Sequence, residues 1–208
     1  MSNEDSQSRL SGFLDAVAAK QPTPGGGAVA AVCGGLAAAI GEMTLNYSIG
    51  RKSTAQFDAE LTHVLGELHT ARAMMLELVA EDQEAFAELT AARKLDDADA
   101  SKAKRLAAAV ENCIAVPRTI GVTALSMLRI VGPVVEKSNK WLLSDLAVCV
   151  ELAMATVRTA QYSVRANLGD VDPERRAVLA QECDDHVRRG VGLVNVTLAK
   201  IAAASGVA

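Results

Sequence analysis

Asp82 is the residue of this sequence best placed to act as an acid or a base, because it interrupts a row of apolar residues. The row recurs at steps of three, four or seven positions and comprises Leu61, Leu65, Leu68, Met75, Val79, Phe86 and Leu89. A carboxyl group among apolar side chains has its charged form disfavoured, so its pKa can rise toward values that suit general acid or base catalysis. The alternative is an ion pair with a basic residue of another helix, in which Asp82 would only hold the helices together.

A second candidate is the glycine-rich segment QPTPGGG at residues 21–27. Consecutive glycines before a helix let a ligand approach the backbone closely, and a helix N-terminus favours negative charge. The segment matches neither the GxGxxG pattern of dinucleotide-binding proteins nor the P-loop. Pro24, Gly25, Gly26 and Gly27 are therefore candidate substrate-binding residues, with a tight turn packed against another helix as the alternative.

Four other polar residues are candidates with equally plain structural explanations. Arg51 and Lys52 could hold a substrate carboxylate, or they could be an exposed basic pair at a helix end. Asn139 could hydrogen-bond a ligand, although loops use asparagine for local backbone reasons. Asp145 follows Ser144 at the expected start of a helix, where capping and the helix dipole would account for both residues.

The histidines and cysteines predict neither a metal site nor a disulfide framework. No histidine pair has helical i, i+4 spacing, and the cysteines lie far apart in apolar stretches: His63, His69, His186, Cys33, Cys113, Cys149 and Cys183. Buried, reduced thiols fit a cytoplasmic protein. The sequence also lacks a GxSxG elbow, so nucleophilic catalysis has no support.

Composition favours a single soluble helical domain. The 208 residues are 50% hydrophobic but only 3% aromatic, which is typical of closely packed helices. A net charge of -4 without basic runs argues against nucleic acid as a partner. The uncharged stretch from Gly25 to Gly41 is rich in Ala and Gly and shorter than the roughly 20 residues that a membrane span needs, so we expect no membrane partner.

The predicted fold is all-α, one domain over residues 1–208, built as a bundle of long antiparallel helices with residues 1–7 frayed. A short first helix ends before Gln21, and the later helices are expected at 28–48, 54–94, from near 106 to 131, 144–167 and from 174 to 204. Pro117 is expected to kink or interrupt the fourth of these helices. The helix at 28–48 is apolar nearly all round and is expected at the centre of the bundle.

Taken in order, several motifs resemble one known family. They are TPGGG with its Ala/Gly helix, GRK, EDQEAF, AVPRTI, SNKWLLSDLAV and RANL, and they run from about Phe13 to Ile201. The set is similar to the C-terminal domain family of formiminotransferase-cyclodeaminase, which includes stand-alone methenyltetrahydrofolate cyclohydrolases. The ordered set is far more specific than any single motif.

The resemblance implies an all-helical protomer, a homodimer or higher homo-oligomer, and a folate site near the dimer interface. It attributes catalysis to Asp82 and places residues 24–27 near the substrate. It matches Asn139 and Asp145 to polar positions of the site, and it assigns the pair at 51–52 to the glutamate tail of the folate. It implies no metal or cofactor beyond the tetrahydrofolate substrate.

Three departures from the family pattern stand out. Leu95, Asp96 and Asp97 replace a usual Leu-Pro-Lys, which removes a positive charge and a rigid turn. Ser138 stands where a glycine is common, and Ser163 where an asparagine is common. A positive charge that helps to bind the folate tail in relatives would therefore have to come from another residue here.

The implied reaction is hydrolysis of 5,10-methenyltetrahydrofolate to 10-formyltetrahydrofolate, with Asp82 accepting and returning protons. One alternative is a formiminotetrahydrofolate cyclodeaminase that closes the ring and releases ammonia. Another is a folate-binding or scaffold homologue without turnover. The sequence contains no formiminotransferase domain, which favours the cyclohydrolase.

Overall fold

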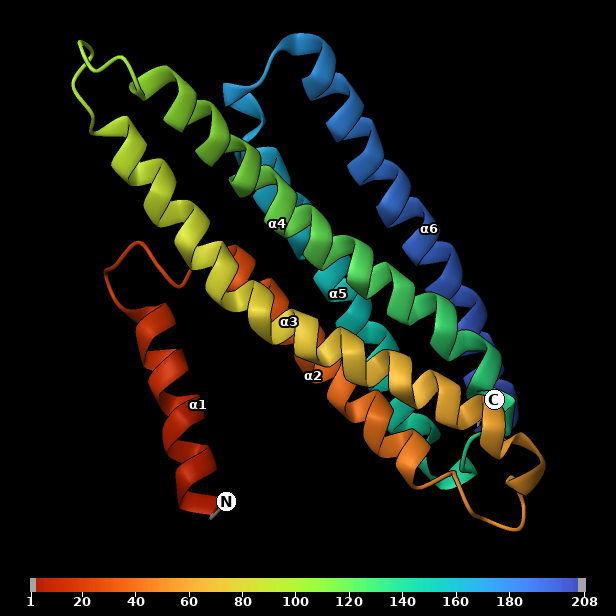
Figure 1. Ribbon diagram of the computed structural model, residues 1–208. Coiled ribbons are helices and arrows are strands. Elements are labelled where there is room, and N and C mark those ends of the chain that lie inside the picture. The colour runs from red at the N-terminus through yellow and green to blue at the C-terminus, as the bar shows by residue number, and fades with distance from the viewer. Residues whose placement is uncertain (1–2, 206–208) are drawn as a thin grey trace.

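Six α-helices joined by short turns make up the part of the chain that the computed structural model describes, residues 3–205 (Figure 1). They are α1 (Asn3–Ala18), α2 (Gly26–Asn46), α3 (Asp58–Arg93), α4 (Lys102–Val131), α5 (Leu143–Ala166) and α6 (Pro173–Ser205). The 3₁₀ segments are η1 (Ala55–Phe57), η2 (Gly132–Lys137), η3 (Lys140–Leu142) and η4 (Leu168–Asp170). No β-strand occurs in this range, so the predicted all-α bundle is confirmed.

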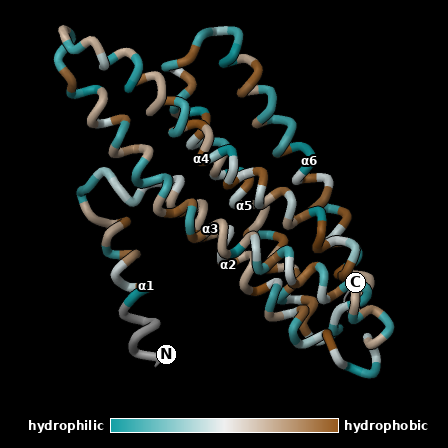
Figure 2. Tube along the Cα trace, viewed as in Figure 1, coloured by the Kyte–Doolittle hydropathy of each residue, from teal (hydrophilic) through white to brown (hydrophobic). Residues whose placement is uncertain are grey.

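The core lies between α2, α3, α4 and α5, and α6 packs against α4 and α5 (Figure 1). Figure 2 shows that apolar positions recur along the length of these helices. Leu45, Leu68 and Leu146 are fully buried in the main cluster. A second cluster, which includes Leu89 and Ile114, closes the end of the bundle where α3 meets α4. The apolar residues that recur at helical spacing in the sequence are therefore mostly the ones that are buried in the bundle.

Small residues let α2 pack closely against α3 and α5. A Cβ atom on Gly34 would lie 2.7 Å from the Cε atom of Met75, so a larger residue at this crossing would require the Met75 side chain to move. The opposite face of α2 is not covered, because Val29, Leu36 and Tyr47 are 40%, 55% and 63% exposed. The expectation of a fully central helix is thus wrong within one chain, since α2 lies at the side of the bundle with an apolar face open.

Pro117 lies inside α4, which continues through it from Lys102 to Val131. Of the two outcomes predicted for Pro117, a kink or a break, the break does not occur, and the end of a neighbouring helix supplies the reason. Proline has no N–H, so the carbonyl of Cys113, four residues earlier, lacks its helical donor. The Nδ2 atom of Asn167, at the end of α5, donates to that carbonyl over 3.1 Å.

Two helix starts differ from expectation. α1 begins at Asn3, so residues 3–7 are helical rather than frayed, and residues 1–2 of that prediction lie outside the described range. α5 begins at Leu143 with Leu142 as its N-cap, so Ser144 does not cap it, although Asp145 does lie in the first turn.

Two stretches are long and apolar enough by composition to cross a membrane, α2 and the span from Lys102 to Lys137. In the bundle, 56% and 50% of their most apolar windows are buried against other helices. About half of each apolar window is therefore buried by packing within the chain.

Candidate functional site

Asp82 lies on the inner side of α3, between buried turns of the helix. Leu78, Ala85 and Leu89 are buried, and steps of four, three and four residues connect them through the half-buried Asp82. Phe86, which the sequence placed in the same row, is 40% exposed. The acid thus interrupts a core-facing row as predicted, with Ala85 rather than Phe86 continuing it.

The carboxylate of Asp82 meets the N-terminus of α2. Its Oδ2 atom accepts a hydrogen bond of 2.9 Å from the backbone N–H of Ala28. The first N–H groups of a helix lack partners within the helix, and the N-cap residue, Gly25, has no side chain to supply one. Asp82 therefore caps α2 from another helix.

Gly27 makes this contact possible. A Cβ atom at this position would lie 1.9 Å from the Oδ1 atom of Asp82 and 2.5 Å from its Cγ atom. Any side chain here would displace either the carboxylate or the turn. The glycine-rich segment and Asp82 are thus parts of one site.

The second carboxylate oxygen remains available. Among residues 9–205, whose side chains the structure describes, no side chain forms an ion pair with Asp82, and its Oδ1 atom accepts no hydrogen bond. That range also holds no fully buried side-chain oxygen or nitrogen without a partner. Water or a ligand can therefore reach Oδ1, and the ion pair considered as the structural alternative is absent from the described contacts.

Burial raises the pKa of Asp82 above its ordinary value, and the hydrogen bond from Ala28 opposes this rise without cancelling it. The N-terminal end of α2 also favours the charged form. A carboxyl group with a raised pKa can exist in both protonation states closer to neutral pH, which general acid and base catalysis requires.

Sequence reasoning missed three neighbours of this site as functional candidates. Ser163 of α5 has its Oγ atom 3.9 Å from the position that a Cβ of Gly26 would take. Cys113 of α4 lies close enough for the charge of Asp82 to help raise the pKa of its thiol, after burial. Asn167, at the end of α5, contacts both helices. Its Nδ2 atom donates to the carbonyl of Cys113 on α4 and also to the carbonyl of Ser163 on α5, over 2.9 Å. Only Ser163, as a departure from the family pattern, carried a signal in the sequence.

The other candidate residues lie at the opposite end of α2. Arg51 and Lys52 are exposed in the turn after α2, and Asp145 is half-buried in the first turn of α5. The backbone N–H of Asn139 donates to Ser48 Oγ over 2.8 Å, at the same end. With a rise of about 1.5 Å per residue, α2 separates this end from Gly26 by about 30 Å. One chain therefore does not bring all the candidate residues together.

Asn139 is buried and serves the local backbone. Its Oδ1 atom accepts from the N–H of Trp141 over 3.2 Å, and its Nδ2 atom donates to the carbonyl of Tyr47 over 3.5 Å. These bonds connect the backbone at Tyr47 with the backbone at Trp141, and the side chains of these two residues are 63% and 85% exposed. Large exposed aromatic residues are unusual on a free surface.

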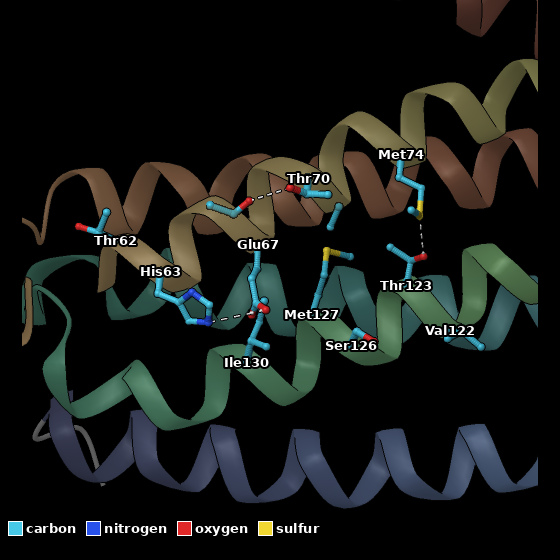
Figure 3. A pocket seen from close by; sticks show the side chains of 12 residues that line it. Thr62, His63, Glu67, Thr70, Met74, Val122, Thr123, Ser126, Met127 and Ile130 are labelled. Atoms are coloured by element: carbon cyan, nitrogen blue, oxygen red, sulfur yellow. Dashed lines mark hydrogen bonds and ion pairs between the residues drawn. The ribbon is translucent and has the colours of Figure 1, made fainter. Parts of the chain in front are cut away.

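A cavity of about 710 Å³ lies between α3 and α4 and does not include Asp82 (Figure 3). Its lining runs from Thr62 to Met74 on α3 and from Val122 to Ile130 on α4. Met74 is eight residues from Asp82, or about 12 Å along the helix. Among the described residues, no group of three or more His, Cys, Asp or Glu side chains could hold a metal ion.

The acidic departure at residues 96–97 has a local structural role. Lys102 Nζ donates to Asp97 Oδ1 over 2.5 Å, and Asp96 Oδ1 accepts from the N–H of Ala98 over 2.8 Å. Both acids lie in the exposed loop between α3 and α4. They stabilise this loop more than ten residues beyond Asp82.

Comparison with known proteins identifies the family. A model described as formiminotransferase-cyclodeaminase matches residues 9–185. The chain belongs to the formiminotransferase-cyclodeaminase family. The match includes the glycine-rich turn, Asp82 and Ser163, so the site described above lies within the part of the chain shared with this family.

Relatives within the family differ in length. A methenyltetrahydrofolate cyclohydrolase from Methylorubrum extorquens is 32% identical, covering 77% of this chain and 79% of that protein. The formimidoyltransferase-cyclodeaminases of Gallus gallus and Mus musculus are 29% and 30% identical, covering 80% and 78% of this chain but 31% of each of those proteins. This chain thus spans about a third of those two proteins.

A solved structure shows the same fold. The crystal structure of a formiminotetrahydrofolate cyclodeaminase from Thermotoga maritima aligns with a TM-score of 0.79 over 95% of both chains, at 24% identity. At this identity the likeness establishes the arrangement of helices alone.

Proposed function

We propose that this protein hydrolyses 5,10-methenyltetrahydrofolate to 10-formyltetrahydrofolate. The observation that carries the proposal is the pairing of Asp82 with the glycine-rich turn, in a family whose named members act on one-carbon forms of folate. The cyclohydrolase of Methylorubrum extorquens is 32% identical and matches this chain over most of both lengths, which supports its reaction as the first candidate.

Asp82 would act as the proton carrier of this reaction. Water attacks the bridging carbon between N5 and N10, and the carboxylate accepts a proton from that water. The tetrahedral adduct then opens by breaking the bond to N5, the carboxyl group returns its proton to that nitrogen, and the hydroxyl proton of the adduct is released to water as the formyl C=O bond forms. The hydrogen bond from Ala28 to Oδ2 fixes the carboxylate and leaves Oδ1 to face the water. The carbon is already electrophilic, so positioning and proton transfer are the main tasks of the enzyme.

The second candidate is a formiminotetrahydrofolate cyclodeaminase. The family description and the names of the vertebrate relatives favour it. In this reaction the formimino carbon joins N5 to N10 and ammonia leaves, with Asp82 protonating the departing amine. The same site could serve both reactions because both involve the same carbon.

Product analysis tests the choice. Purified protein is given 5,10-methenyltetrahydrofolate in one reaction and 5-formiminotetrahydrofolate in another. The proposal predicts accelerated formation of 10-formyltetrahydrofolate in the first and no ammonia above background in the second. Ammonia release would establish the cyclodeaminase instead, and binding without turnover of either compound would establish a non-catalytic folate-binding protein.

A homodimer is the second part of the proposal. The open face of α2 forms a continuous apolar row at steps of four and three residues, made of Val29, Cys33, Leu36, Ile40, Met43 and Tyr47. Leu36 is the central residue of the helix, so two copies can pair antiparallel with Leu36 on the two-fold axis. Such an interface is self-complementary, because Val29 of each copy then faces Met43 of the other.

This pairing would complete the site. It sets Tyr47 of one copy opposite Gly25 of the other, and so it moves the distant candidate residues to within reach of Asp82. Tyr47 and Trp141 offer flat aromatic faces for the pterin ring, and Arg51 and Lys52 offer positive charge for the glutamate tail. The roughly 30 Å that separate the two ends within one chain would then be bridged between chains.

The remaining expectations stay part of the proposal. We propose a cytoplasmic protein that needs no metal or cofactor beyond its tetrahydrofolate substrate and binds neither nucleic acid nor membrane. The net charge of -4 and the free cysteines support these expectations.

A further inference from the structure

α1 carries apolar side chains that the rest of the chain leaves uncovered. Leu10 and Leu14 are each 56% exposed, and Phe13 and Val17 continue their face at helical spacing. Figure 1 shows α1 standing apart from the other five helices. Among the described side chains of α1, residues 9–18, the hydrogen bonds are local, as between Ser11 and Asp15. A helix of 16 residues is marginally stable in water without a packing partner, so α1 needs a surface to lie on.

The groove between α3 and α4 has the complementary character. Its cavity of about 710 Å³ is lined by Ala71, Met74, Val122, Met127 and Ile130, with threonine and serine hydroxyls among them. Figure 3 shows side chains of both helices pointing into this space. Met74 and Val122 are among the exposed large apolar residues of the bundle. A surface of this kind suits the apolar face of an amphipathic helix.

The position of α1 favours the groove of a second copy over its own. In Figure 1, α1 stands on the side of α2 and α3 that faces away from α4, whereas the residues that line the groove belong to α3 and α4. α1 connects to the first residue of α2. In the antiparallel pairing this end meets the C-terminal half of the partner's α2. The groove lies beside that half, because Arg72 of α3 forms an ion pair of 2.6 Å with Glu42 of α2.

We propose that α1 of each protomer docks into the α3–α4 groove of a second copy of the chain, exchanging one helix in each direction. The proposal rests on the homodimer proposed above and adds an interaction surface to it. Because only seven residues separate the end of α1 from Gly26, docking on the partner would also restrain the glycine-rich turn beside Asp82. Assembly and the geometry of the site would then be coupled.

Disulfide trapping between mixed chains tests the exchange. One chain carries Leu14→Cys and the other Val122→Cys, both in a Cys33→Ser background that removes the more accessible native thiol. After the purified chains are mixed to exchange subunits and mildly oxidised, we expect a covalent dimer containing one chain of each kind. A matched mixture with Val178→Cys, on the exposed face of α6, should give no such product.

Three results would overturn the proposal. A disulfide within a single chain carrying both substitutions, with none between mixed chains, would place α1 on its own groove. Protection of the Val122→Cys thiol from maleimide by 5,10-methenyltetrahydrofolate, but not by α1, would make the groove a ligand site. No disulfide in either format, with both thiols reactive to maleimide, would leave α1 off the groove.

Two further variants separate this proposal from the homodimer. Leu10→Ser with Leu14→Ser should weaken dimer association at least about tenfold by sedimentation, whereas Val178→Ser with Val196→Ser on α6 should not. Leu36→Cys, on the proposed axis, should crosslink to itself between copies. If Leu36→Cys crosslinks while the α1 pair does not, the homodimer holds and the exchange of α1 is wrong.

Discussion

Asp82 combines a structural contact with a reactive one. Its Oδ2 atom is held by the N–H of Ala28, and its Oδ1 atom is left open beside Gly27. The contact fixes the direction of the carboxylate, and partial burial raises its pKa. The ion pair that the sequence left open is absent from the described contacts, and the structural role that Asp82 does have, capping α2, is compatible with a catalytic role.

Gly27→Ala should impair activity more than stability. The new Cβ would overlap the carboxylate, so Asp82 must rotate away or the turn must shift, at a cost of about 1–3 kcal/mol. We expect at least a hundredfold loss of kcat/KM, because displacement of a reacting group by about 1 Å is that costly. Gly192→Ala, where a Cβ meets nothing within 4 Å, is the matched control and should leave activity unchanged.

The raised pKa of Asp82 should make its contribution to stability fall as pH rises. Protonated Asp82 contributes stability that is fully present below its unfolded pKa, near 3.8, and lost as pH rises through its higher folded value. Relative to the wild type, Asp82→Asn should thus gain stability over this window in urea titrations. The activity that depends on ionised Asp82 should rise through the same raised pKa.

Asp97→Asn provides the control of opposite sign. The hydrogen bond from Lys102 lowers the pKa of Asp97, so its contribution is present above the unfolded pKa and lost as pH falls through the folded one. This variant should lose a little stability at neutral pH. A gain of stability in Asp97→Asn, or none in Asp82→Asn, would contradict the assigned pKa shifts.

The sequence predicts part of this site and not the rest. Asp82 stands out because an acid breaks a periodic row, and the glycines stand out because they are consecutive. The contact from Ala28 could not be foreseen, since a backbone N–H has no signature in sequence. Ser163 and Cys113 reach the site only through the crossing of α4 and α5 with α2.

At the scale of elements, hydrophobic spacing predicts the helices but not how they support one another. The expected boundaries of α2, α3 and α5 fall within a few residues of those observed. Pro117 is the informative case, because its sequence predicts a kink or a break and α4 continues through it. A donor from α5, Asn167, replaces the missing N–H, and no local pattern connects these two residues.

Asn167 and Pro117 should therefore be energetically coupled. Asn167→Ala leaves the carbonyl of Cys113 without a donor and should cost about 1–3 kcal/mol of unfolding free energy. In a Pro117→Ala background the helix can supply its own N–H, so the same substitution should cost clearly less. A double-mutant cycle by chemical denaturation measures this difference, and additive effects would show that the two residues act independently.

At the scale of the whole molecule, the candidate site residues are divided between the two ends of α2. One end of α2 holds Asp82 and the glycine-rich turn, and the other end holds Arg51, Asn139 and Asp145. The family resemblance groups these residues without giving their distances, because motif order contains no information on helix length. The open apolar face of α2 suggests how two copies reunite them.

Subunit complementation tests whether residues from two chains form one site. Trp141→Ala and Asp82→Asn chains should each lose activity alone. If one site uses Asp82 of one chain and Trp141 of the other, a mixed dimer contains one site without either substitution. Random exchange then gives half mixed dimers, so about a quarter of wild-type activity should return. Absence of recovery, with mixed dimers shown by mass spectrometry, would mean that each site uses a single chain.

The most direct test of the account follows the absorbance of 5,10-methenyltetrahydrofolate in the presence of wild-type protein and of Asp82→Asn, corrected for spontaneous hydrolysis. If Asp82 is the proton carrier, the absorbance should fall rapidly with the wild type. With Asp82→Asn, shown to be folded by circular dichroism, it should fall only at the uncatalysed rate. Equal rates for wild type and folded Asp82→Asn would contradict the role of Asp82 as the proton carrier.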